Sequence, residues 1–183
     1  MKKWLKWTLI IMGVISLSLY GLYRYGLYST KKHSPEAVAA YSVDGTEISI
    51  NYSQPGVKGR VVFGELVPYG EVWRTGANEA TTFSTNRDLL IGEERLAAGD
   101  YTLWTVPGPR SWTIIWNEKS YFWGINAQGA AREEDYDVLA VEAEVQELDE
   151  LVERFTIEVS EEQNQLSLRW EYTEVSIPFQ KAP

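Results

Sequence analysis

The segment of residues 58–81, KGRVVFGELVPYGEVWRTGANEAT, contains the side chains best suited to bind a ligand. Its two arginines would present planar guanidinium donors to an anionic or polyhydroxyl ligand. An amide and a carboxylate follow them, and tryptophans here and later in the chain would supply an aromatic platform. Aromatic rings with a few convergent polar groups are the usual composition of ligand sites. The candidate ligand-binding residues are therefore Arg60, Trp73, Arg74, Asn78, Glu79, Trp104 and Trp123.

The same segment also has a purely structural interpretation, as a long crossover that closes a β-sandwich. Its arginines would then pair with acids or stack on rings, and Asn78 would bond backbone groups in a turn. Its glycines match no phosphate-binding loop, and scattered glycines more often allow positive φ and tight backbone crossings. The side chains expected to fill the core are Phe63, Leu66, Val67, Tyr69, Val72 and Trp73.

Catalytic chemistry has few candidate residues in this chain. A Ser–His–acid triad needs a histidine held inside a fold, and the single histidine, His33, lies in the N-terminal part. With one histidine and no cysteine, we predict no metal site and no cofactor. An all-oxygen Ca²⁺ site among the thirteen acids of residues 133–162 is the alternative to a solvated acidic face, which is preferred. A glycosidase needs two carboxylates about 5–9.5 Å apart, and Glu65, Glu71 and Glu79 leave that alternative open. The catalytic residues of such an enzyme are not assigned, and the non-enzymatic interpretation is preferred.

The charge of the chain is unevenly distributed, which excludes one class of partner. The net charge is −9 over 183 residues, yet residues 1–32 contain six bases and no acid. The remainder therefore has 11 basic and 26 acidic residues, a net charge of −15. So acidic a domain is repelled by phosphate backbones, and we predict no nucleic-acid partner. The absence of cysteine fits an exported protein that folds without disulfides.

An uncharged run from Trp7 to Tyr23 follows three lysines at the N-terminus. This run would form a helix of about 25 Å, close to the ~30 Å hydrocarbon core of a bilayer. Tryptophans at one end and tyrosines at the other resemble the aromatic belts of membrane helices. We predict that residues 1–23 are a membrane anchor, with residues 4–23 in contact with lipid, and that residues 24–36 are a tether. A cleaved signal peptide is the alternative.

Period-two alternation dominates residues 37–180 and predicts extended strands. Asp44-Gly45 suits a two-residue type I′ turn, which would pair Tyr41 with Ile48 and Ala39 with Ile50. The apolar residues of both strands then share one face, so the turn and the alternation agree.

A second hairpin is predicted across the four-residue loop 107–110. This loop would pair Leu103 with Ile114 on the core face. Trp104 would then be an isolated aromatic residue on a mostly polar face, where a ligand could reach it.

The remaining segments complete an all-β fold. Residues 146–154, QELDELVER, are predicted to form a short helix or a loop. About nine short strands indicate a single antiparallel β-sandwich domain at residues 37–180, preceded by one N-terminal transmembrane helix. The further strands are predicted at 81–86, 89–91, 138–145, 154–159, 166–172 and 175–179.

Several blocks of the chain resemble a known protein family. They are YSQPGVKGRVVFGELVPYGEVWRTGANEAT at 52–81, LAAGDYTLWTVPG at 96–108, WTIIWNEK at 112–119 and RWEYTEV at 169–175. Together they are similar to an uncharacterised family of exported bacterial proteins, a domain of unknown function abundant in Bacteroidota. The resemblance covers roughly residues 34–179, and it implies a β-sandwich and export but no activity. Gln54 departs from the pattern, because many relatives have a basic residue there.

These features favour a membrane-anchored, non-catalytic module that binds a glycan, a small molecule or an envelope protein. A glycan-acting hydrolase with a carboxylate pair is one alternative, and a structural or assembly domain of the envelope is another. The anchor predicts a location at the bacterial inner membrane with the domain in the periplasm. Cleavage of the N-terminal segment would instead release the domain into the periplasm.

Overall fold

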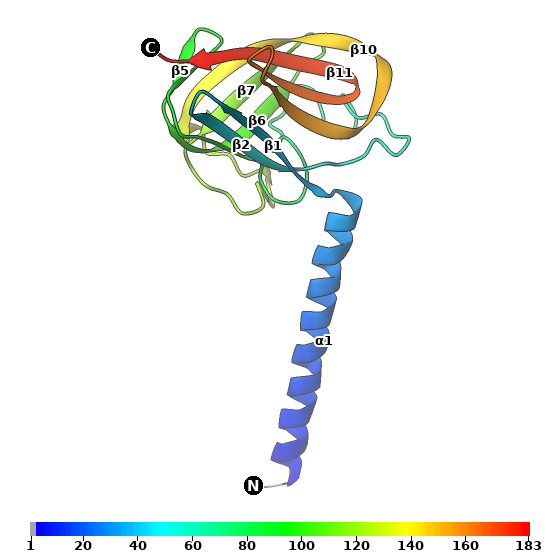
Figure 1. Cartoon of the computed structure of the whole chain (residues 1–183). Helices are drawn as coiled ribbons and strands as arrows, with labels where there is room; N and C mark the ends of the chain where they lie inside the picture. Colours follow the sequence, from blue (N-terminus) through cyan, green and yellow to red (C-terminus); the bar gives the residue numbers. More distant parts are fainter. Residues whose placement is uncertain (1–2) are drawn as a thin grey trace. The chain divides into compact units, whose positions relative to one another are not determined.

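The computed structural model describes residues 3–183 and divides into helix α1 and a β-domain, Ser34–Pro183. Helix α1 (Lys3–His33) buries none of its side chains. Its length and composition would allow it to cross a membrane, which confirms the prediction of one N-terminal helix of this type. The helix continues through most of the segment predicted as a tether, so Ser34 and Pro35 are the residues between it and the first strand (Figure 1).

Eleven strands make up the β-domain over the described residues. Nine form one antiparallel sheet in the order β1-β2-β3-β6-β7-β10-β11-β4-β5, and β8 and β9 form a separate hairpin. This sheet confirms the all-β, antiparallel prediction. The strands are β1 (Glu36–Val43), β2 (Thr46–Ser53), β3 (Thr82–Thr85), β4 (Leu89–Ile91), β5 (Glu94–Leu96), β6 (Gly99–Pro107), β7 (Ser111–Asn117), β8 (Ile125–Asn126), β9 (Gly129–Ala130), β10 (Asp137–Ser160) and β11 (Gln165–Lys181).

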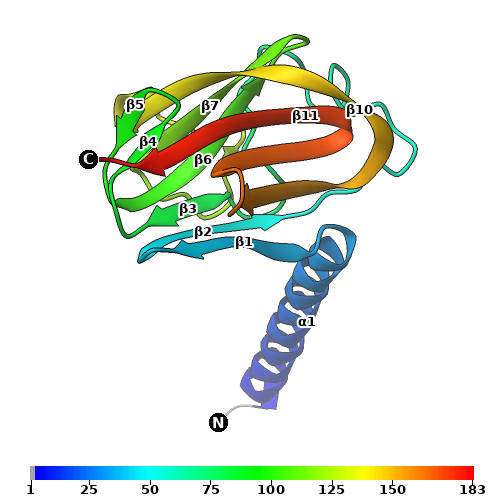
Figure 2. The same ribbon diagram turned by 45° about the horizontal axis from the view of Figure 1, so that its top comes forward.

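Two layers arise because the long strand β10 bends and takes part in both (Figure 2). Its residues 137–144 pair with β7, whereas residues from Val145 onward pair with β11. Two register shifts between Glu147 and Thr156 mark the bend. Residues 146–154 are therefore strand, and the prediction of a short helix or loop there is wrong. Bulged residues break the period-two pattern, so the alternation that identifies a strand is lost at this point.

The core lies between the two layers and is rich in aromatic rings. Phe63 and Trp73 from the crossover of residues 54–81 contact rings of the strands, with Trp73 stacked on Trp170 at 5.7 Å between ring centroids. Phe63 and Val67 are buried as predicted, but Leu66 and Tyr69 are exposed. The crossover therefore fills the core with only part of its apolar residues. The aromatic cluster consists of Phe63, Trp73, Trp112, Phe155 and Trp170.

The β1–β2 hairpin has the predicted register, with Tyr41 opposite Ile48 and Ala39 opposite Ile50. Asp44 and Gly45 have φ values of 51° and 73°, and a type I′ turn needs positive φ at both positions. The turn and the burial of one face thus select the same pairing.

The β6–β7 hairpin is shifted by two residues from the predicted register, because Leu103 lies opposite Trp116 and not Ile114. A shift of two residues leaves every side chain on its predicted face. Gly108 permits the loop, since a Cβ atom there would lie 2.5 Å from the carbonyl oxygen of Ser111.

One edge of β10 is closed by side chains, in a seam formed by residues 52–57 and 153–157. The Tyr52 hydroxyl accepts the Ile157 N–H at 3.0 Å and donates to the Ile157 carbonyl at 3.3 Å. Gln54 Nε2 donates to the Phe155 carbonyl at 3.2 Å, and the Phe155 N–H donates to the Pro55 carbonyl at 3.0 Å. The neutral Gln54 therefore has a place in the fold that needs no positive charge.

Candidate functional site

Residues 73–81 run beside β6 and are fixed to it by backbone and hydroxyl hydrogen bonds. The Trp73 N–H donates to the Thr105 carbonyl at 2.7 Å, and the Thr105 N–H donates to the Trp73 carbonyl at 3.0 Å. Thr81 Oγ1 donates to the Thr75 carbonyl at 2.7 Å inside the domain. A Cβ atom at Gly76 would lie 3.0 Å from the Ser53 carbonyl oxygen, so the segment crosses β2 more closely than another residue allows.

Arg74 connects this segment to a loop that follows it by almost fifty residues. Its guanidinium donates to the Asn78 carbonyl at 3.0 Å and to the Trp123 carbonyl at 3.1 Å. Burial lowers the pKa of Arg74, and the charge of the nearby Glu79 carboxylate opposes that shift. Bonds of a charged donor to two carbonyls are the arrangement expected of a structural clamp.

Asn78 and Arg60 also donate to backbone carbonyls. Asn78 is buried with φ of 59°, and its Nδ2 donates to the Ser34 carbonyl at 3.1 Å. Arg60 donates to the carbonyls of Gly56 at 2.7 Å and Val57 at 3.1 Å, in its own loop. The prediction that the two arginines pair with acids or rings is therefore incomplete, because carbonyl oxygens take the donors of both.

The three candidate tryptophans do not form an exposed platform. Trp73 belongs to the aromatic cluster, and its Nε1 donates to the Gly76 carbonyl at 3.0 Å. Trp104 is fully buried under Tyr121, with ring centroids 5.2 Å apart, so the expectation of an exposed Trp104 is wrong. The segment between β7 and β10 folds over this face of β6, which period-two alternation does not reveal. Trp123 is half-buried beside the exposed ring of Phe122.

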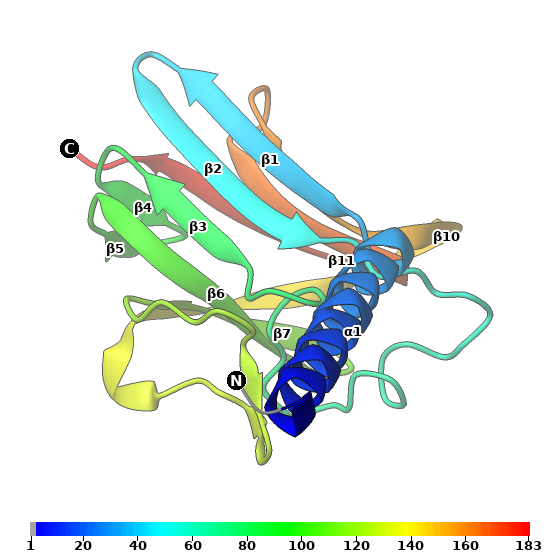
Figure 3. The same ribbon diagram turned by 90° about the horizontal axis from the view of Figure 1, so that it is seen from below.

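Three adjoining hollows lie on the outward face of β1, β2, β3 and β6. These four strands follow one another in the sheet (Figure 3). The first hollow has a volume of about 450 Å³, the second about 310 Å³ and the third about 360 Å³. The first and second share Ser84 and Asp100, and the second and third share Asn51 and Thr82. We call this continuous surface the outer trough. Glu79 is the one predicted candidate residue that lines it.

The outer trough is shallow-sided, and polar residue types with a net negative charge make up most of its lining, although apolar atoms contribute the larger share of its exposed surface. Small hydroxyl and amide side chains form much of its floor, because the apolar residues of the same strands point into the core. Its single base, Lys119, is paired with Glu133 at 2.5 Å. The five acids that line the three hollows are Glu36, Glu47, Glu79, Asp100 and Glu118.

A family model described as "Protein of unknown function (DUF2911)" matches residues 34–179. The chain belongs to the DUF2911 family. The match begins at the residue where the β-domain begins and includes the crossover, the seam and the outer trough. No curated protein and no solved structure matches the chain.

In this DUF2911 domain, packing and internal hydrogen bonds explain most of the residue types in the segment WRTGANEAT. Trp73 fills the core, Arg74 joins two loops, Gly76 allows a close crossing, Asn78 holds Ser34 and Thr81 bonds within the segment. The trough residues gave no comparable signal, because serine and threonine on the exposed face of a strand are ordinary. The one feature of the sequence that could have identified them is their spacing. Ser49, Asn51 and Ser84 alternate with buried residues of β2 and β3.

Proposed function

We propose that this DUF2911 domain is a non-catalytic module that binds a ligand in the outer trough. The observation that supports the proposal is the run of three joined hollows along the outward face of β1, β2, β3 and β6. Concave surfaces with a few placed polar groups are where ligands bind. The crossover, from which binding was first predicted, then contributes one wall through Glu79 and Ala80.

The chemistry of the trough indicates a neutral or cationic ligand that is rich in hydroxyl or amino groups. Serine, threonine and asparagine can donate to and accept from such groups. Five acids and one base in the lining repel an anion, and both arginines that would have attracted one are bonded to carbonyls. A glycan with neutral or amino sugars has this composition, and a polar segment of an envelope protein is the second class that fits.

The location is part of the same proposal. Helix α1 has the length and composition of a membrane anchor, and lysines precede its apolar run. Positive charge before a first apolar segment favours retention of the N-terminus in the cytoplasm. The β-domain would then lie on the periplasmic side of the inner membrane of a bacterium, with α1 as anchor or as an export signal.

A trough-blocking variant tests the proposal. Residues 34–183 form a compact unit of their own, so the domain can be produced without α1. Neutral and amino-sugar glycans are screened by thermal shift and then by calorimetry. Ser84→Arg places a long side chain where two hollows meet and should reduce the affinity of any trough ligand at least ~10-fold, about 1.4 kcal/mol. The control, Gln163→Arg, adds the same charge in the exposed turn between β10 and β11.

A second substitution separates the two ligand classes. Asp100→Asn removes one charge from the first and second hollows with almost no change of shape. It should weaken a cationic ligand about 2- to 5-fold and leave a neutral ligand unchanged, since exposed charge pairs contribute about 1 kcal/mol or less. Equal affinities for the native domain, Ser84→Arg and Gln163→Arg would contradict binding in the trough.

A glycan-acting hydrolase is the alternative that one feature favours, because Asp100 and Glu118 line the same hollow. Two carboxylates across a cleft are the requirement of that chemistry. Turnover of a glycan by the native domain, lost in both Asp100→Asn and Glu118→Gln, would replace the binding module with this enzyme.

A further inference from the structure

The loop between β7 and β10 carries the most exposed apolar side chain of the β-domain. Phe122 is 77% exposed and Ile125 is 47% exposed, and both lie in the segment Ser120–Ala131. This segment, SYFWGINAQGAA, contains no charged residue in a domain with a net charge of −15. An apolar tip without charge, on so acidic a protein, is a mark of an interaction surface.

The loop holds this exposed tip in a defined position. The Phe122 carbonyl accepts the Ala80 N–H at 3.3 Å, and Arg74 bonds the next carbonyl, that of Trp123. At the two ends of the segment, Lys119 pairs with Glu133 and Arg132 pairs with Asp137. Tyr121 Oη also accepts the Glu133 N–H at 2.9 Å. These bonds hold the loop in a conformation that exposes the Phe122 ring.

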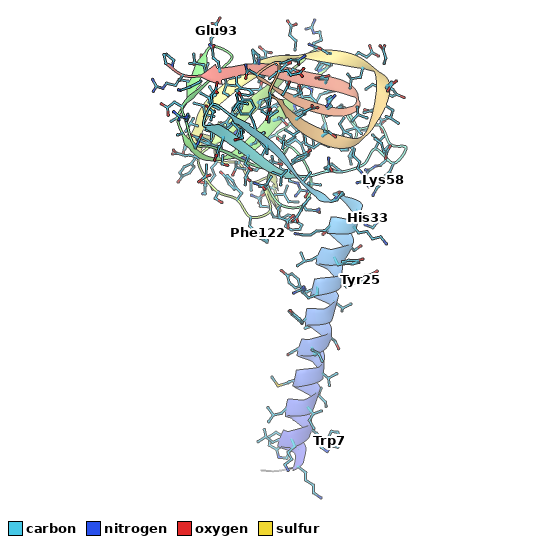
Figure 4. All side chains as sticks on the ribbon, viewed as in Figure 1. Trp7, Tyr25, His33, Lys58, Glu93 and Phe122 are labelled. Atoms are coloured by element: carbon cyan, nitrogen blue, oxygen red, sulfur yellow. The ribbon has the colours of Figure 1, made fainter. Side chains whose placement is uncertain are left out.

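The loop lies at the end of the β-domain where the chain enters from α1. Asn78 bonds the Ser34 carbonyl with its side chain, while its own carbonyl shares the Arg74 guanidinium with Trp123. Direct hydrogen bonds thus join Ser34, the 73–81 segment and the segment Ser120–Ala131, which we call the Phe122 loop. Within the domain, Figure 4 shows Phe122 and Glu93 at opposite ends.

We infer that the Phe122 loop contacts the lipid surface of the membrane that α1 crosses. Residues 24–33 of α1 extend about 15 Å beyond the apolar run, and two residues then join α1 to β1, so Ser34 lies at most roughly 20 Å along the chain from the end of that run. Aromatic side chains are favoured at the membrane–water interface. A segment without charge can enter that interface, whereas the acidic surfaces of the domain are repelled by anionic lipids. The inference rests on the proposed anchoring by α1, and its test includes a separate readout for that step.

The experiment uses three single-cysteine variants of the full chain, which has no native cysteine. Ser16→Cys reports the centre of α1, Phe122→Cys the loop and Glu93→Cys the opposite end of the domain. Each is labelled with a small fluorophore and reconstituted into phosphatidylcholine vesicles, with and without lipids that carry a quencher either high on the acyl chain or near its end. Circular dichroism checks that each labelled chain keeps its β-structure.

We expect the deep quencher to act most strongly at position 16, and the shallow quencher to act on position 122 at least about three-fold more strongly than on position 93. Quenching at 16 with equal, low values at 122 and 93 overturns the lipid contact while the anchor stands. Low quenching at all three positions refutes the anchor itself, and the lipid contact fails with it.

Discussion

Replacing Arg74 by methionine tests whether its guanidinium is a structural clamp. Methionine keeps the apolar stem beside Gly124 and removes the donor to the carbonyls of Asn78 and Trp123. Hydrogen bonds to a charged group contribute about 1.5–3 kcal/mol each, so two give roughly 3–6 kcal/mol. Burial of the charge, which lowers the pKa of Arg74, offsets part of this. We expect a net loss of about 2 kcal/mol in the free energy of unfolding.

Thermal unfolding of residues 34–183, followed by circular dichroism, measures this loss. For a domain of about 150 residues, it corresponds to a fall of roughly 4–8 °C in Tm. Hydrogen exchange should also accelerate at the Ala80 amide, which bonds the loop that Arg74 holds. The matched control is Arg60→Met, since Arg60 also donates to two carbonyls, both within four residues. Arg60 is exposed, unlike the half-buried Arg74, so solvent competes for its bonds and they should contribute less than about 1 kcal/mol.

An unchanged Tm in Arg74→Met would refute the clamp. The guanidinium would then contribute nothing to stability, and Arg74 would return to the ligand-binding candidates. An equal fall in Arg74→Met and Arg60→Met would also contradict the reasoning, because only the bond from Arg74 to Trp123 joins distant parts of the chain.

Three other substitutions test separate parts of the fold. Gly76→Ala places a methyl group 3.0 Å from the Ser53 carbonyl at φ of 152° and should cost about 1–3 kcal/mol, measured by urea unfolding. Tyr52→Phe removes the hydroxyl that serves both backbone groups of Ile157 and should cost about 1–3 kcal/mol, with faster exchange of that amide. Arg95 and the Ala98 N–H hold the pKa of Asp88 below its ordinary value, so its carboxylate stabilises the fold above that ordinary pKa and loses this effect as the pH falls through the folded pKa. Asp88→Asn should therefore have a lower Tm than the native domain near pH 6, and this difference should disappear as the pH falls through the folded pKa.

Local patterns in the sequence predict structure where neighbouring residues decide it. The β1–β2 register follows from Asp44-Gly45 and from one apolar face, both within eighteen residues. Trp104 could not be placed in this way, because the segment that covers it is separated from β6 by β7. The strand at residues 146–154 was missed because bulges interrupt its alternation.

The candidate site shows the same division. Sequence reasoning identified residues 73–81 as exceptional, and their dense hydrogen bonding explains why those residue types occur together. Apart from Glu79, it did not identify the lining of the outer trough, which comes mostly from four strands and from residues of ordinary type. A concave surface depends on how strands are placed, and one sequence read along its length does not contain that arrangement.

The seam between Tyr52 and Ile157 sets an order of events during synthesis. These two residues are 105 positions apart, so the first hairpin cannot acquire these partners until the chain as far as Ile157 is available to fold. Contacts between such distant residues form slowly, because chain entropy is lost before they contribute to stability. The first hairpin therefore stays without these bonds until β10 is in place, and the arrival of β10 limits how soon this edge of the domain resists proteolysis.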